Sequence, residues 1–155
     1  MVNRSIYILI FLCFFGFAQA RAATQIITLK SKVFDNERSL RILLPEGYDR
    51  EREEPYPVLY MNDGQNLYSA EDSMTGQEWQ MDEILPSLIK NGNLEPIIVV
   101  GIDTLSYADR ANEYLPWPDE YLTPYIEEPM GSSYPDFLEQ EVLPLIEQKY
   151  NVGKT

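Results

Sequence analysis

Histidine is absent from the whole chain. Its imidazole is the usual general base near neutral pH and the commonest zinc ligand, so these residues alone cannot form a site that needs one. The acidic residues are scattered without the spacing of a metal-binding set, which is typical of a solvated surface. We therefore expect no metal site and no cofactor.

Cysteine occurs only once, at Cys13, inside an apolar segment near the amino terminus. If that segment is removed after export, the remaining chain carries no thiol. A thiol nucleophile, a soft-metal site and a disulfide scaffold are then excluded.

Positive charge is also scarce, because 12 Lys and Arg residues face 25 Asp and Glu residues and give a formal net charge of −13. Binding to nucleic acid or to anionic membrane surfaces depends on clustered Lys and Arg. We expect no nucleic-acid partner, and the acidity itself favours solubility outside the cell.

The amino terminus has the pattern of a secretory signal peptide. Arg4 precedes an apolar run from Ile6 to Ala18, and small residues follow in Ala18-Gln19-Ala20 and Ala20-Arg21-Ala22. The run is shorter than the roughly 20 apolar residues that span a bilayer, which favours a cleaved signal over a membrane anchor. We expect residues 1–22 to be the signal, the protein to be periplasmic or secreted, and no stable membrane association after cleavage.

Residues 23–155 have the length of one domain, and 45% of the whole sequence is apolar. Stretches 24–29 and 39–44 predict an antiparallel pair of strands. Continuous apolar runs at 57–61 and 96–102 predict strands covered on both faces. Between them, Met81, Ile84, Leu85 and Leu88 have helical spacing within 79–90, and Pro86 predicts a kink or a new start. Strand, helix and strand in this order indicate a βαβ unit.

The rest of the chain divides into a predicted loop and a predicted helix. Residues 106–134 show no clear periodicity and are rich in tyrosine and proline, which is typical of a long functional loop. Residues 135–150 predict a helix with Ser133 as its N-cap. Pro144 makes the helical pattern less regular. The apolar face of the predicted helix consists of Leu138, Val142, Leu145, Ile146 and Tyr150.

Several segments, taken in order, resemble one family. Residues 41–48 (RILLPEGY) and 56–67 (YPVLYMNDGQNL) are similar to the putative esterase family of α/β hydrolases, which includes esterase D, enterochelin esterases and feruloyl esterases. Further similarities follow at 97–103, 110–114 and 137–150. The resemblance implies a doubly wound, mainly parallel sheet with helices on both faces, of which residues 23–155 would form the first half. It also implies carboxylic ester hydrolysis by a serine nucleophile through an acyl-enzyme.

The catalytic triad of that family has no counterpart in this chain. Its nucleophile lies in a Gly-x-Ser-x-Gly elbow, followed by an acid and then a histidine, and no such elbow occurs here. We therefore expect no catalytic residue within the chain, which would end before the elbow and be inactive alone. Asp103 follows a strand, but an acid before the nucleophile contradicts the family order, so we interpret it as the start of a loop.

In α/β hydrolases one donor of the oxyanion hole is a main-chain N–H in the loop after the third strand. The resemblance makes Gln65 the first candidate for this N–H and Asn66 the second. Gly64 would let the backbone turn sharply toward a substrate. The alternative is that Asp63-Gly64 is only a tight turn.

Aromatic residues of the 106–134 segment are candidate substrate contacts. Trp117, Tyr114 and Tyr121 could form a wall against a phenolic acyl group or a sugar, or could be local packing. Arg110 and Glu113 could anchor the loop or bind a polar substrate group. The expected partner is a small-molecule or glycan-linked ester, and the negative charge favours neutral acylated sugars over strongly anionic substrates.

Two alternatives to an esterase stay open. The chain could be a non-catalytic, extracytoplasmic carbohydrate-binding domain that uses its aromatic loop, or a structural or transfer protein on a hydrolase scaffold. The absence of histidine favours such a function, whereas the βαβ pattern favours the enzyme.

Overall fold

The structure is a computed structural model that describes residues 23–154. The predicted signal peptide, residues 1–22, lies outside the described residues. Among the described helices, none combines the length and the apolar character needed to cross a membrane.

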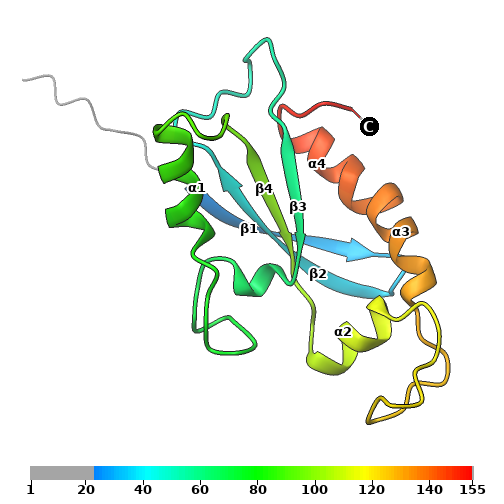
Figure 1. The fold of residues 1–155 in the computed structure, drawn as a ribbon. Helices are drawn as coiled ribbons and strands as arrows, with labels where there is room; N and C mark the ends of the chain where they lie inside the picture. The colour runs from blue at the N-terminus through cyan, green and yellow to red at the C-terminus, as the bar shows by residue number, and fades with distance from the viewer. Residues whose placement is uncertain (1–22, 155) are drawn as a thin grey trace, which may run out of the picture.

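A four-stranded mixed sheet in the order β1-β2-β4-β3 forms the centre of the molecule (Figure 1). Strands β1 (Ala23–Ser31) and β2 (Asn36–Leu44) form the predicted antiparallel hairpin. Strand β4 (Ile98–Ile102) pairs antiparallel with β2 and parallel with β3 (Val58–Asn62). The predicted βαβ unit is thus confirmed, and its two strands are the only parallel pair in the described part of the chain.

Helices cover both faces of this sheet (Figure 1). Helix α1 (Met81–Lys90) packs on one face, where Leu85 meets Leu43, Leu67 and Val99. On the other face lie α3 (Tyr134–Phe137), the π-helical segment η3 (Leu138–Val142) and α4 (Leu143–Lys149). They complete the larger core, whose most deeply buried side chains are Leu40, Ile42, Ile98, Val100, Ile102, Phe137, Val142 and Ile146.

The two apolar strands differ in burial. Strand β4 is buried at every position, as its continuous apolar sequence predicts. The same prediction is wrong for β3, where Leu59 is 38% exposed and the other side chains are only partly buried or exposed. The cause is position, because β3 lies at the edge of the described sheet, where fewer elements cover it.

Pro86 neither ends the helix nor starts a new one. Helix α1 runs without interruption through this residue, although proline has no N–H to donate to the preceding turn. The predicted apolar face is also only partly buried, since Ile84 and Leu88 are 46% and 37% exposed. Leu85 is the one fully buried residue of this helix, and Met81 packs against the same core while only partly buried.

Residues 106–134 are not a continuous loop. They contain helix α2 (Tyr107–Tyr114) and the short 3-10 turn η2 (Gly131–Ser133). The side chain of Ser106 caps α2 by accepting a hydrogen bond from the Asp109 N–H at 3.1 Å. Ser-x-x-Asp is close to a capping box, and this local signal could have predicted the helix start.

The last predicted helix is present, but in three consecutive parts. The helical hydrogen-bond pattern widens over η3 just before Pro144, which lies in the first turn of α4 and lacks an N–H. Val142 and Ile146 are buried as predicted. The prediction of Ser133 as N-cap is wrong, because this residue belongs to η2 and its side chain makes no capping bond.

Candidate active site at the carboxyl edge of β3 and β4

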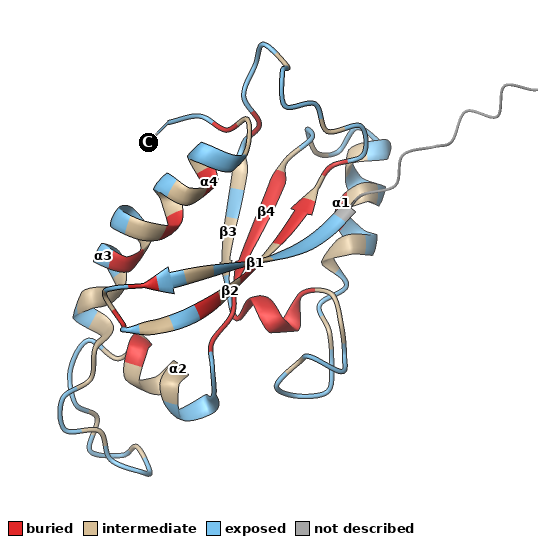
Figure 2. Cartoon of the chain, turned by 180° about the vertical axis from the view of Figure 1, so that it is seen from behind, coloured by how far each residue is buried: buried red, intermediate tan, exposed pale blue. Residues whose placement is uncertain are grey.

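The segment after β3 forms a buried turn at the carboxyl edge of the sheet. Asp63 precedes the 3-10 turn η1 (Gly64–Asn66), whose three residues are all buried. Figure 2 shows this turn as a buried segment between the sheet and the connection to α1. Asp103 and Thr104 follow β4 at the same edge, because the two strands are parallel. In open α/β sheets, ligands bind at this edge.

Gly64 allows close contact between η1 and β4. A Cβ added at this position would lie 2.5 Å from the carbonyl carbon of Gly101 and 2.7 Å from the Ile102 nitrogen. The sharp turn that the sequence assigns to Gly64 is made by Asp63 instead, which has a left-handed backbone with φ 57°. Gly64 is therefore needed for space rather than for a left-handed conformation.

The hydrogen bonds of η1 fix the direction of its peptide groups. The Asn66 N–H donates to the Asp63 carbonyl at 2.9 Å, and the Leu67 N–H donates to the Gly64 carbonyl at 3.1 Å. In a trans peptide the N–H points opposite to the C=O, so the Gln65 N–H is directed away from the turn. It takes part in no strand ladder. The Asn66 N–H, by contrast, is already used within the turn.

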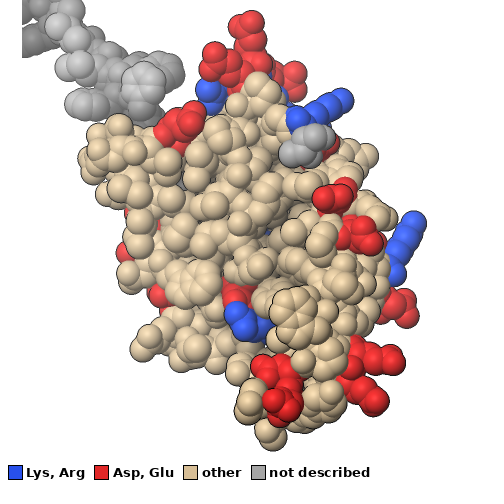
Figure 3. Space-filling model, turned by 45° about the vertical axis from the view of Figure 1, so that its right-hand side comes forward, with Lys and Arg blue, Asp and Glu red and all other residues tan. Residues whose placement is uncertain are grey.

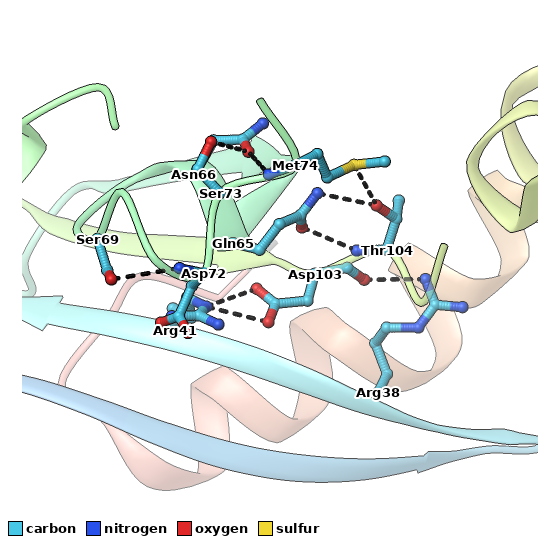
Figure 4. A network of polar contacts seen from close by, with 10 residues as sticks. All are labelled: Arg38, Arg41, Gln65, Asn66, Ser69, Asp72, Ser73, Met74, Asp103 and Thr104. Carbon is cyan, nitrogen blue, oxygen red and sulfur yellow. Dashed lines mark hydrogen bonds and ion pairs between the residues drawn. The ribbon is translucent and has the colours of Figure 1, made fainter. Parts of the chain in front are cut away.

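The side chains of η1 are also fixed. Gln65 Nε2 donates to the Thr104 hydroxyl at 2.9 Å, and its Oε1 accepts from the Thr104 N–H at 3.1 Å (Figure 4). Asn66 Oδ1 accepts from the Ser73 hydroxyl and the Met74 N–H, each at 3.0 Å. The first pair holds η1 against the end of β4, and the second pair orders the following loop.

Asp103 is paired with Arg41 of β2. Arg41 Nε lies 2.9 and 3.0 Å from the two carboxylate oxygens, and Arg41 Nη1 binds Asp72 at 2.6 Å (Figure 4). Burial raises the pKa of Asp103 above its ordinary value, although the hydrogen bond from Arg41 acts to lower it. These contacts agree with the interpretation of Asp103 as a structural residue at the start of a loop.

A buried ion pair anchors α2 to the sheet. Arg38 of β2 is fully buried and binds both carboxylate oxygens of Glu113, at 2.7 and 2.5 Å. Arg38 also donates to the Asp103 carbonyl at 3.0 Å, and its guanidinium lies within 6 Å of the Phe34 and Phe137 rings. Of the two roles open to Glu113, the structure supports the anchor rather than a substrate contact.

Arg38 is not among the residues that the sequence predicts for the site. Its position contains a signal, however, because Arg38 lies in phase with Leu40 and Ile42 on β2 and therefore faces the core. An arginine on the buried face of a strand needs a carboxylate partner.

Arg110 of α2 binds Asp63 in a two-pronged ion pair. Its Nε lies 2.9 and 3.1 Å from the carboxylate oxygens, and its Nη2 lies 3.0 Å from Oδ2. Its guanidinium also lies 5.2 Å from the centre of the Tyr114 ring, which packs edge-on against Tyr134. The Arg110 side chain is 43% exposed, whereas that of Asp63 is 11% exposed. The Arg110 side chain is therefore partly accessible from solvent, and its Nη1 makes none of these three contacts with Asp63.

The remaining predicted aromatic residues lie on the surface. Trp117 is 70% and Tyr121 is 87% exposed, and neither ring packs on another aromatic ring among the described residues. In the face shown in Figure 3, charged side chains, mostly acidic, lie mainly along the top, right and bottom edges, with largely uncharged surface between them. The described residues contain no group of three or more side chains suited to hold a metal ion.

A parallel β3–α1–β4 unit, helices on both faces and a polar turn after the edge strand define one half of an α/β-hydrolase fold. The family model described as "Putative esterase" matches residues 31–155, so the chain belongs to the putative esterase family.

Solved structures support the same fold. An IroE-like serine hydrolase from Shewanella oneidensis is 25% identical with a TM-score of 0.65, over 84% of this chain and 40% of that one. The enterobactin esterase FES from Shigella flexneri is 23% identical with a TM-score of 0.62, over 87% and 29%. A ferulic acid esterase is 22% identical with a TM-score of 0.54, over 85% and 46%.

The chain thus spans less than half the length of each of these structures. No match was found among curated proteins.

Proposed function

We propose that the intact protein containing this chain is a serine carboxylic ester hydrolase that works through an acyl-enzyme. The observation that carries the proposal is the Gln65 N–H, which points away from the buried turn η1 at the carboxyl edge of the sheet and makes none of the hydrogen bonds that fix this turn. A fixed N–H in this place can donate to the oxygen that becomes negatively charged in the tetrahedral intermediate. One such donor typically contributes a hundredfold or more to the rate.

The open side of β3 gives the nucleophile a place next to this turn. Tyr56 and Val152 form a parallel bridge, with the Tyr56 N–H donating to the Asn151 carbonyl at 2.9 Å. A strand that continues in this register would reach the level of Asp63 about seven residues after Val152. We propose that the Gly-x-Ser-x-Gly elbow lies there, with the acid and the histidine further on, so that residues 1–155 alone are inactive.

The substrate would bind where α2 meets the turn. Trp117 and Tyr121 offer exposed aromatic surface for a phenolic acyl group or a sugar, and the accessible part of Arg110 can donate to a polar substituent. Two similar structures are esterases of enterobactin and of ferulic acid. For this chain, the formal charge of −13 favours a neutral small-molecule or glycan-linked ester. We propose that the protein acts after export.

The experiment extends the coding sequence beyond Thr155 and assays the intact protein and residues 1–155 on a simple phenyl ester. We expect turnover only from the intact protein, and its loss when the serine of the elbow is replaced by alanine. The absence of an elbow, or equal turnover by the serine variant, would contradict the serine mechanism. Turnover by residues 1–155 above a denatured control would contradict their inactivity.

A second candidate is a non-catalytic carbohydrate-binding domain, favoured by the exposed Trp117 and Tyr121 and by the absence of histidine. Calorimetric titration with neutral oligosaccharides separates the two. Micromolar glycan binding without ester turnover in the intact protein would support binding alone.

A further inference from the structure

Asp63 adopts a backbone conformation that is uncommon for a residue with a side chain. Its φ of 57° and ψ of 45° lie in the left-handed region, which Asp and Asn tolerate better than most residues. This conformation turns the chain from β3 into η1. It also directs the Asp63 carbonyl to the Asn66 N–H at 2.9 Å. The orientation of the next two peptide groups, including the Gln65 N–H, therefore depends on Asp63.

The side chain of Asp63 is held from a different part of the molecule. Its two carboxylate oxygens receive three hydrogen bonds from Arg110, all within 3.1 Å. Arg110 lies on α2, and the neighbouring Glu113 fixes that helix to β2 through Arg38. Two ion pairs, Arg38–Glu113 and Arg110–Asp63, thus link α2 to the sheet and to the turn that carries Gln65.

We propose that Asp63 and Arg110 form a positioning pair that sets the direction of the Gln65 N–H toward the reacting oxygen. The inference rests on the proposed function and adds two residues to it. Neither residue would touch the reacting atoms. A donor displaced by about 1 Å can cost on the order of a hundredfold in rate, so a hydrogen-bonded anchor at this turn has a direct effect on catalysis.

The test separates the backbone role of Asp63 from its ion pair. Asp63→Gly keeps the left-handed turn, because glycine adopts positive φ freely, but removes the anchor for Arg110. Arg110→Ala removes the other partner, and Arg110→Lys keeps the charge without the two-pronged geometry. These variants and the double variant Asp63→Gly/Arg110→Ala are made in the intact esterase and assayed on a phenyl ester.

We expect kcat to fall about 10- to 100-fold in each single variant, with KM changed less than about twofold. The kcat of the double variant should be no lower than that of the less active single variant, because both changes remove the same interaction. Arg110→Lys should recover part of the loss. Affinity for an arylboronic acid, whose tetrahedral adduct imitates the intermediate, should fall in parallel with kcat.

The matched control is Lys30→Ala. Lys30 forms an exposed ion pair with Glu37 at 3.6 Å across the β1–β2 hairpin. Its kcat and boronate affinity should equal those of the wild type.

Three results would overturn the inference. Full kcat in Asp63→Gly means that the turn needs only its backbone conformation. A rise in KM without a fall in kcat for Arg110→Ala means that Arg110 binds substrate instead. Losses that add in the double variant mean that the residues act separately. Failure of the proposed function is distinguished because the wild type itself would then show no ester turnover.

Discussion

The faces of the sheet and its carboxyl edge are stabilised by different interactions. Both faces are covered through apolar contacts, which involve α1 on one side and α3, η3 and α4 on the other. The carboxyl edge is held by three arginine–carboxylate pairs: Arg38–Glu113, Arg41–Asp103 and Arg110–Asp63. Apolar packing tolerates small changes of register and angle, whereas a two-pronged ion pair fixes the direction of both side chains.

This difference indicates that side-chain and backbone orientations must be fixed most closely at the carboxyl edge. Two of the three arginines come from β2, one from each of its faces, and they reach the segments that follow β4. The edge that carries Gln65 is therefore oriented by the hairpin strand as well as by its own turn.

The largest effect is expected when the buried pair loses one partner. Glu113→Ala leaves Arg38 charged and fully buried, so we expect a loss of about 3–5 kcal/mol in the free energy of unfolding. Chemical denaturation of the intact protein measures this loss. The matched change Glu37→Ala removes an exposed pair with Lys30 and should cost less than about 1 kcal/mol. Equal losses of stability for the two variants would contradict the role of the buried ion pair in stabilising the carboxyl edge.

The next effect concerns the close contact between η1 and β4. We expect Gly64→Ala to destabilise the protein by about 1–3 kcal/mol, because the added methyl group would overlap the backbone of Gly101 and Ile102. Thermal unfolding provides the measurement. Gly153→Ala is the control, since a Cβ there meets nothing within 4 Å. A Gly64→Ala protein as stable as this control would contradict the close packing of the turn.

Trp117→Ala should affect activity without affecting stability. The side chain is 70% exposed, so its removal should leave the melting temperature unchanged. We expect kcat/KM for an aromatic ester to fall about tenfold, consistent with the loss of one stacked ring, while a short aliphatic ester is turned over as before. Unchanged turnover of both esters would show that Trp117 does not line the substrate site.

The smallest effect should be seen in the pH dependence of stability. Burial raises the pKa of Asp103 in the folded protein above its ordinary value of 3.8. The group therefore stabilises the folded state at pH values below 3.8, and this contribution is lost as the pH rises through the folded pKa. Wild type should gain stability relative to Asp103→Asn on acidification, as measured by denaturation at several pH values. A difference that is constant with pH would contradict the shift.

Local signals in the sequence predicted much of the fold. The apolar run at 96–102 gave the fully buried strand β4, and the two strands of the hairpin followed from their composition. Helix α2 was missed because it is short and has only alanine and tyrosine as apolar residues, although the Ser106 cap was visible. Pro86 predicted a kink or a new start, but helix α1 continues through this residue as one element.

The sequence predicted which residues belong to the candidate site, but not how they contact one another. Gln65 and Asn66 could be identified from the resemblance, yet their different accessibility depends on the hydrogen bonds of one turn. Arg110 and Glu113 were identified as anchors or substrate contacts. Their partners, Asp63 and Arg38, lie 47 and 75 positions away in the sequence.

The sequence by itself determined the types of the strands and of the helices other than α2, the family resemblance, and the absence of a thiol or imidazole for catalysis among residues 23–155. These properties depend on composition and on spacing between near neighbours. Only the tertiary structure decided which carboxylate pairs with which arginine, and that Asp63 rather than Gly64 makes the left-handed turn. The reason is that a buried charged side chain needs a partner of opposite charge, which can lie anywhere along the chain. The spacing of residues in the sequence does not show which partner the fold brings close.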